Sequence, residues 1–184
     1  MNADGTDTRR VADELDVRGA PAWSPDALSL AAAAANRDGE PRVFRIPIDG
    51  GAPVLLVNEY STDPIFAPSG RFLVYTGADV GTNISVKAVS IDGTPYRLPT
   101  LVLTRGARRL AFLNGDDALV IMKGGISHKE FWVVNLKTGS ERQLTNLGRE
   151  FVIGDFDVSP DGRELIFDRV QEESDIVLFE LPSR

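Results

Sequence analysis

The sequence contains no cysteine and only one histidine, and both scarcities exclude kinds of chemistry. Without cysteine there is neither a disulfide framework nor a thiolate metal site. The single histidine, His128, rules out a multi-histidine metal site, and no Gly-x-Ser-x-Gly nucleophile motif accompanies it. We therefore expect His128 to be a surface loop residue, and we predict a non-enzymatic protein that needs no metal and no cofactor.

Long apolar runs are also missing. The longest, residues 28–35, spans eight residues, whereas a transmembrane helix needs about 20. The first seven residues are polar and lack the apolar run of a secretory signal. We expect no membrane insertion. As the chain stands we expect it to be cytoplasmic, or periplasmic if a signal upstream has been removed.

Clustered basic charge is the third absence. The formal net charge is -7, and the only adjacent basic residues are pairs such as Arg9 with Arg10. Proteins that bind nucleic acid without sequence preference need clustered Lys and Arg to displace counterions. We therefore predict that this domain contacts no nucleic acid directly. Its 184 residues, 42% hydrophobic and 26% charged, are typical of one soluble globular domain.

A repeat runs through the whole chain. Trp23, Phe66, Phe112 and Val158 occupy equivalent positions, each next to a turn sequence, and they are 43, 46 and 46 residues apart. That period matches a four-stranded propeller blade. Each unit continues with an apolar strand, an alternating strand, a glycine hairpin and a short fourth strand. We predict an all-β fold, a β-propeller of about four four-stranded antiparallel blades in one domain, 1–184. The blades are predicted at 20–62, 63–108, 109–154, and 155–184 plus 1–17.

Two details of this prediction depend on the repeat rather than on local preference. Alanine favours helix, yet the five residues Ala31 to Ala35 fall where the other repeats have strands, so we expect a strand there. The aromatic residues Trp23, Phe66, Phe112 and Trp132 fall on strand positions, and we expect them in the core.

The two ends of the chain predict how the sheets close. The last repeat stops after its third strand, residues 176–179, and Thr8 to Val11 match the fourth-strand position. We expect this N-terminal strand to complete the last blade, which would protect both sheet edges. Two alternatives remain open. Either four blades close alone, or they are part of a larger ring completed by further sequence or by a second chain, as in a homodimer.

Several turn and hairpin sequences recur in phase with the repeat: Met1–Thr6, Trp23–Asp26, Ile48–Gly51, Gln143–Thr145 and Ser159–Gly162. They resemble those of the TolB-like propeller repeat, a relative of the WD repeat. The resemblance departs from the family pattern at Ala27, where glycine is expected, and at residues 113–116, which lack the proline. It implies a propeller used mainly for protein interaction. Such propellers form the C-terminal region of larger bacterial proteins with winged-helix or kinase domains, and TolB itself is periplasmic and works with an outer-membrane lipoprotein.

We therefore predict a protein–protein interaction module, an accessory region of a larger bacterial protein. The alternative is a sensor or regulatory domain that binds a small molecule or an ion in the central channel. Acidic pairs such as Asp155 with Asp157 could bind calcium, but turn formation explains them better. A partner is expected at one rim, where the loops before the first strands meet those between the second and third strands. The rim residues are Arg18, Arg37, Asp63, Arg109, His128, Lys129 and Asp155.

Overall fold

The computed structural model describes residues 4–6, 8–35, 39–81, 83–104, 110–113, 115–125, 128–147, 152–159 and 161–169. All regular structure in these residues is β, and every strand pairing is antiparallel. No helix in the described part of the chain is long and apolar enough to cross a membrane.

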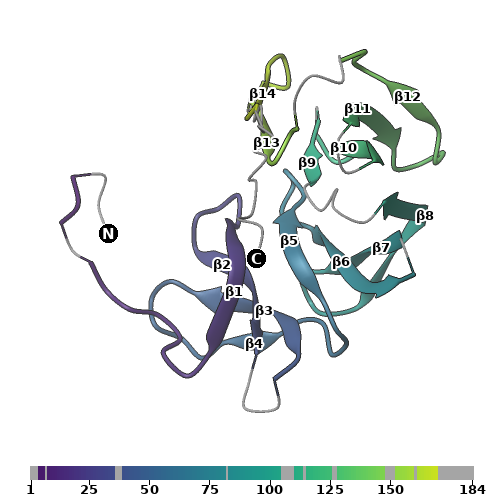
Figure 1. Ribbon diagram of the computed structural model, residues 1–184. Coiled ribbons are helices and arrows are strands. Elements are labelled where there is room, and N and C mark those ends of the chain that lie inside the picture. Colours follow the sequence, from purple (N-terminus) through teal and green to yellow (C-terminus); the bar gives the residue numbers. More distant parts are fainter. Residues whose placement is uncertain are drawn as a thin grey trace, which may run out of the picture.

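The strands form four successive sheets in chain order, arranged side by side around a central space (Figure 1). The first sheet holds β1 (Asp16–Trp23), β2 (Ser29–Ala35), β3 (Pro41–Pro47) and β4 (Val54–Leu55). The second holds β5 (Thr62–Phe66), β6 (Phe72–Val80), β7 (Asn83–Ser90) and β8 (Pro95–Thr104). The third holds β9 (Leu110–Phe112), β10 (Ala118–Gly125), β11 (His128–Asn135) and β12 (Glu141–Gln143). The fourth holds β13 (Phe156–Val158) and β14 (Leu165–Phe167).

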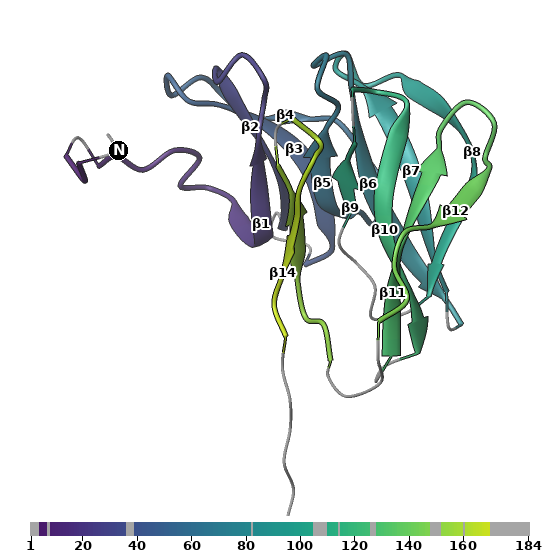
Figure 2. The same cartoon turned by 90° about the horizontal axis from the view of Figure 1, so that it is seen from above.

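Each sheet packs face to face on the next, because its second strand is apolar on both sides. Successive side chains of a strand point to opposite faces. In β6, Leu73 and Tyr75 pack toward the first sheet, while Phe72 and Val74 pack toward the third. In β10, Leu119 in turn packs toward the second sheet. The core is therefore a series of layers between sheets (Figure 2), which is the packing of a propeller.

The turn between the first two strands of a blade has the same construction in the first and fourth sheets. In the first, the Ser24 hydroxyl donates to Asp26 Oδ1 at 2.6 Å, and the Leu28 amide donates to the same oxygen at 3.0 Å. In the fourth, the Ser159 hydroxyl donates to Asp161 at 2.6 Å. Hydrogen bonds from serine and from a backbone amide lower the pKa of both carboxyl groups. The recurring Ser-x-Asp sequence is thus a turn device.

The alanine run forms β2, as the repeat predicts. All five alanines are buried between β1 and β3, with Ala33 paired to Arg18 on one side and to Val43 on the other. Small side chains let neighbouring elements approach this central strand closely. Packing and strand pairing therefore override the helix preference of alanine.

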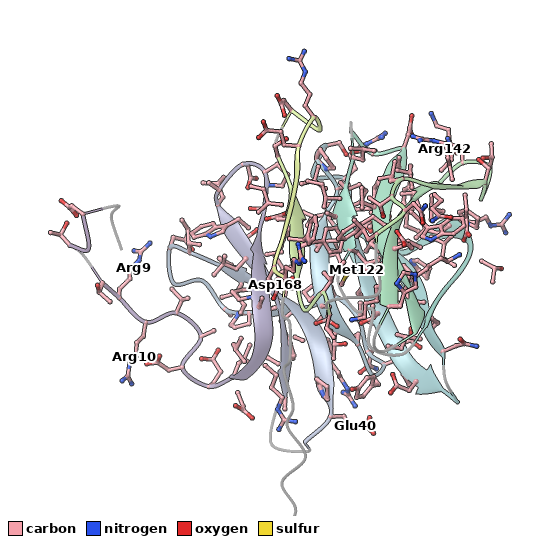
Figure 3. The ribbon with its side chains drawn as sticks, turned by 45° about the horizontal axis from the view of Figure 1, so that its top comes forward. Arg9, Arg10, Glu40, Met122, Arg142 and Asp168 are labelled. Atoms are coloured by element: carbon pink, nitrogen blue, oxygen red, sulfur yellow. The ribbon has the colours of Figure 1, made fainter. Side chains whose placement is uncertain are left out.

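The predicted N-terminal strand is wrong. Residues 8–12 form no strand, and Arg9 and Arg10 lie on a segment that runs away from the sheets (Figure 3). Val11, Ala12 and Leu15 pack instead on the first sheet. Burial of these side chains on that face competes with the pairing that was expected. The predicted third strand of the last blade, residues 176–179, lies outside the described residues.

The expectation that Trp23 is a core residue is also wrong, because its side chain is largely exposed. Phe66 is buried, and Phe112 and Trp132 pack against the core between the second and third sheets. Trp23 differs because the face of β1 that carries it is turned away from the second sheet.

Candidate functional site

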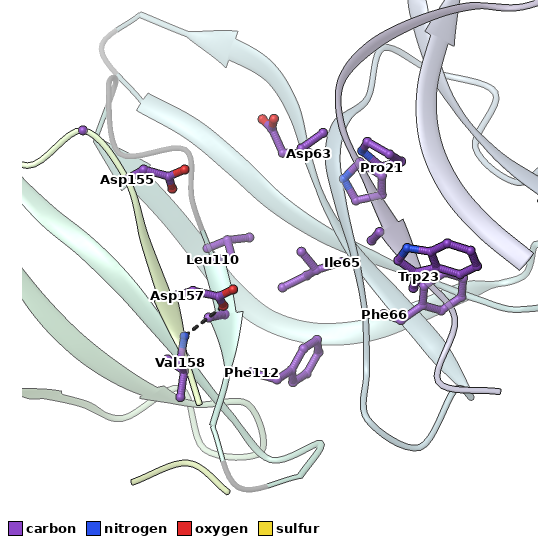
Figure 4. Close-up of a pocket in the computed structure, with 15 residues that line it drawn as sticks. Pro21, Trp23, Asp63, Ile65, Phe66, Leu110, Phe112, Asp155, Asp157 and Val158 are labelled. Carbon is purple, nitrogen blue, oxygen red and sulfur yellow. Dashed lines mark hydrogen bonds between the residues drawn. The ribbon is translucent and has the colours of Figure 1, made fainter. Parts of the chain in front are cut away.

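The first strands of the four sheets surround a cavity of about 700 Å³ at the centre of the molecule (Figure 4). β1, β5 and β9 contribute mainly apolar side chains, among them Trp23, Phe66 and Phe112. Three carboxylates also line it, from Asp63, Asp155 and Asp157. No Lys or Arg is among the lining residues that the structure describes. The described lining therefore combines apolar walls with three carboxylates.

Asp63 is held in a rare backbone conformation. Its φ of 50° lies in the left-handed region, and the pairing of β5 with β6 is irregular between Thr62 and Ile65. The hydroxyls of Thr62 and Thr76 each donate to Asp63 Oδ2 at 3.0 Å. These hydrogen bonds hold the carboxylate in place. The backbone conformation at Asp63 is one that non-glycine residues adopt seldom, although aspartate tolerates it better than most. Asp63 is thus a positioned group rather than a freely rotating one.

The second carboxylate comes from the loop before β13. The backbone amides of Gly154 and Asp155 both donate to Asp168 Oδ1 at 2.7 Å, so the side chain after β14 holds this loop. A Cβ at position 154 would lie 2.7 Å from Asp168 Oδ2, and glycine is needed for that close approach. Asp157 lies two residues further along, on β13, and also lines the cavity. Its Oδ1 accepts from the amide of Val158 at 2.9 Å (Figure 4).

This set of side chains offers carboxylates and apolar surface. The described lining residues include no histidine, serine, threonine or lysine, so the aspartates are the proton-transfer groups among them. No group of three or more His, Asp or Glu residues in the described part of the chain is placed to hold a metal ion. Carboxylates beside apolar walls suit a cationic group with an aliphatic or aromatic neighbour.

Two of the residues predicted for the rim, Asp63 and Asp155, lie together in the cavity. Arg18 lies on β1 outside the lining and forms an ion pair with Asp16 at 3.1 Å. Lys129 reaches the loop before β13, because its Nζ donates to the Ile153 carbonyl at 3.1 Å. Arg37 and Arg109 lie outside the described residues.

His128 is not in a loop, as was expected, but is the first residue of β11. Its Nε2 lies 3.4 Å from Oε1 of Glu130, a buried carboxylate that also accepts from the Thr145 hydroxyl and the Leu147 amide. The pair belongs to the third sheet and does not line the cavity.

Asp157 and the threonine partners of Asp63 are the site residues that the sequence did not single out. Asp157 was seen only as one half of an acidic pair. Its spacing of two from Asp155 was a usable signal, because side chains two residues apart lie on the same side of an extended chain. Thr76 had no signal, since it lies 13 residues from Asp63 and the two meet only through the irregular pairing of β5 with β6.

The chain matches no protein-family model and no curated protein sequence. Its fold, however, is similar to several solved structures. A TolB protein from Agrobacterium tumefaciens superposes with a TM-score of 0.67 at 19% identity, over 84% of this chain and 55% of that one. TolB from Acinetobacter baumannii superposes with a TM-score of 0.62 at 17% identity, over 81% of this chain and 37% of that one.

Other similar structures have different activities. One belongs to a nidogen/laminin complex, with a TM-score of 0.58 at 16% identity over 81% of this chain and 55% of that one. Another is a puromycin-hydrolyzing peptidase of Mycobacterium tuberculosis, with a TM-score of 0.62 at 18% identity over 89% of this chain and 32% of that one. The matched stretch spans about half of these chains or less. At such identities the likeness establishes architecture alone. The chain has the fold of a TolB-like β-propeller.

Proposed function

We propose that this propeller is a non-enzymatic protein-binding module whose central cavity receives a basic segment of its partner. One observation carries the proposal: three carboxylates line the cavity beside apolar side chains, and its described lining residues include no Lys or Arg. A lysine or arginine side chain would place its charge near Asp63 and Asp155 and lay its stem along Trp23 or Phe66. Arginine and lysine commonly pack their aliphatic stem on apolar surface while their charged group meets a polar or aromatic partner.

The charge of the whole chain supports a basic partner. A net charge of -7 attracts cationic segments over distances longer than a contact, which raises the association rate at low ionic strength. Arg18, His128 and Lys129, together with Arg37 and Arg109, remain proposed rim residues that would meet the acidic or polar flanks of such a segment.

The absence of histidine, serine, threonine and lysine among the described lining residues favours binding over a reaction that uses those groups. Some propellers of this fold occur in peptidases, so the fold alone does not decide the matter. That the propeller is an accessory region of a larger bacterial protein is proposed on the resemblance of its repeats to the TolB-like family.

A labelled hexa-arginine peptide tests the proposed cavity directly. Fluorescence anisotropy would measure its dissociation constant for the wild type and for Asp63→Asn/Asp155→Asn. We expect roughly tenfold weaker binding by the double variant, because one lost charge-assisted hydrogen bond corresponds to about 1.5 kcal/mol. The matched control is Asp13→Asn/Glu14→Gln, which removes the same charge from an exposed segment outside the cavity. Equal weakening by both variants would reduce the effect to overall charge and refute the cavity.

The size of the cavity supports a second candidate function, the binding of a small molecule or an ion. About 700 Å³ lies within the range of ligand sites, roughly 300–1,000 Å³. A thermal-shift screen of metal ions and metabolites separates the two candidates. A rise in melting temperature that Asp63→Asn/Asp155→Asn abolishes would favour the small ligand, since a ligand of the native state stabilises it by mass action.

A further inference from the structure

The three internal contacts between sheets follow one rule. The large apolar residue at the end of a first strand packs against a second-strand residue of the preceding sheet. That second-strand residue lies eight positions after the equivalent large apolar residue of its own repeat. Phe66 thus shares a buried cluster with Ala31, Phe112 with Val74, and Val158 with Val120. The strand register is also the same in all four sheets. The residue before the large apolar residue pairs with that second-strand residue: Ala22 with Ala31, Ile65 with Val74, Ala111 with Val120 and Asp157 with Ile166.

The same rule predicts a fourth contact, in which Trp23 packs on Ile166. Both side chains are instead largely exposed. Ala31, Val74 and Val120 are 0%, 0% and 1% exposed, but Ile166, at the equivalent position, is 69% exposed. Trp23 is 60% exposed, whereas the equivalent Phe66 is 9% exposed. At the equivalent positions of the other sheets, an adjacent sheet covers the side chain. The sheet face at each end of the stack is therefore of the kind that packs on another sheet.

The face at the start of the stack is broadly apolar. We call it the first free face, and it holds the side chains of β1–β4 that point away from the second sheet. Val11, Ala12 and Leu15 cover part of it, so Phe44 is buried, but other large apolar side chains remain exposed. Its exposed members are Val17, Trp23 and Leu55, placed by their pairing with Ala34, Leu30 and Phe44.

The face at the other end, the second free face, holds Ile166 and its pairing partner Asp157. It has the orientation that faces a following sheet, as Val120 does in the third sheet. The first free face has the orientation that faces a preceding sheet, as Phe66 does in the second. The two faces are therefore complementary to each other and not to themselves. No buried cluster of the described residues joins the first sheet to the fourth.

We propose that a second copy of this chain covers both free faces, with the first free face of each copy on the second free face of the other. Each end contact continues the interface that already joins adjacent sheets within the chain. The matched stretch of this chain covers 55% of the TolB chain from Agrobacterium tumefaciens, so two such stretches would have about the length of that chain. Two copies related by a twofold axis form a closed ring, which leaves no further face for a third.

Light scattering after gel filtration, over a range of chain concentrations, tests the assembly. We expect a species of twice the chain mass of 20.0 kDa that dissociates on dilution. Leu55→Asp should raise the dimer dissociation constant by at least about tenfold, because it places an unpaired carboxylate in an apolar contact. The matched control is Val54→Asp. It lies on the same strand at similar exposure, 43% against 40%, but its pairing with Arg45 turns it to the opposite face.

Ile166→Asp distinguishes this head-to-tail ring from a dimer in which two first free faces meet. The substitution should weaken the dimer as much as Trp23→Asp does, since every contact uses both faces. Three results would overturn the proposal. The first is a monomer at all concentrations, which would mean that the free faces are open or covered by something else. The second is a dimer that Ile166→Asp leaves unchanged, and the third is equal weakening by Leu55→Asp and Val54→Asp.

Discussion

Replacing Ala27 with glycine should stabilise the protein. Ala27 has a φ of 57°, in the left-handed region, and its amide donates to the Ser24 carbonyl at 2.8 Å. Gly70 and Gly162 occupy the same place in the second and fourth sheets, with φ of 71° and 68° and the same 2.8 Å hydrogen bond. The turn therefore requires this conformation, and the first blade adopts it with a residue that disfavours it.

Two opposing effects set the size of the gain. A residue with a Cβ loses about 1–2 kcal/mol in the left-handed region. Glycine removes that loss but makes the unfolded chain more flexible, which costs about 0.4–1 kcal/mol. Ala27→Gly should therefore raise the free energy of unfolding by about 0.5–1 kcal/mol, or the melting temperature by about 1–4 °C in a chain of this size.

Urea unfolding followed by circular dichroism, together with calorimetry, would measure this difference. The reverse substitution, Gly70→Ala, is the matched control and should destabilise by a similar amount. Its new Cβ would lie 3.7 Å from Pro25, an ordinary contact, so its cost is conformational rather than steric. If Ala27→Gly left the protein unchanged or less stable while Gly70→Ala destabilised it, strain at Ala27 would not be the explanation.

Three further predictions concern the contacts between sheets and their pH dependence. Phe131→Ala should lower the free energy of unfolding by about 3–5 kcal/mol in urea titrations, because this fully buried ring packs between the third and fourth sheets. Burial opposes ionisation of Asp116, but hydrogen bonds from Ser69 and Arg71 of the second sheet lower its pKa below the usual 3.8. Its contribution to stability is therefore present at neutral pH and is lost as the pH falls below about 4, so Asp116→Asn should destabilise at pH 7 and much less in acid. Burial, and then the neighbouring Glu59, raise the pKa of Tyr75 above its usual 10.0. Its contribution is full below pH 10 and is lost above it, so the stability of Tyr75→Phe, measured by unfolding at successive pH values, should fall less steeply in that range.

The sequence repeat predicted the strands of the first three sheets. Phe66, Phe112 and Val158 lie at the ends of the first strands β5, β9 and β13, and the hairpin glycines lie where strands turn back. Even Ala31 to Ala35 followed from the repeat, because a strand between two others is stabilised by pairing and packing that its own preference does not reveal. In this chain the spacing of the repeats predicts the strands better than the intrinsic secondary-structure propensity of single residues does.

The repeat does not show whether another sheet covers a given sheet face. The pattern assigns Trp23 to a face, but only the arrangement of whole sheets shows that no sheet covers it. The same limit explains the error at Thr8 to Val11, where a match to the fourth-strand pattern was taken for a strand. Whether such a segment pairs or packs depends on which edge or face lies within reach, and a single sequence does not record that.

The rim expected from the sequence shares two residues with the cavity. Asp63 and Asp155 were named for the rim because they lie close to the start of a first strand, and first strands surround the axis of a propeller. Asp157 and Thr76 depend on the register of strand pairing at one irregular point and on which strand face meets the cavity. Those are properties of the folded sheets.

The cavity and the free faces are connected through shared residues. Trp23 belongs to the first free face and Asp157 to the second, and both also line the cavity. Covering the free faces would therefore change the walls of the cavity: it would bury the indole beside a second copy and bring that copy's first strands to the axis. Removing the surrounding water strengthens the attraction between the carboxylates and a cationic side chain, because fewer solvent dipoles screen them. A basic segment and a second copy should consequently favour each other, since each ligand that prefers the closed ring raises the affinity for the other by the same factor.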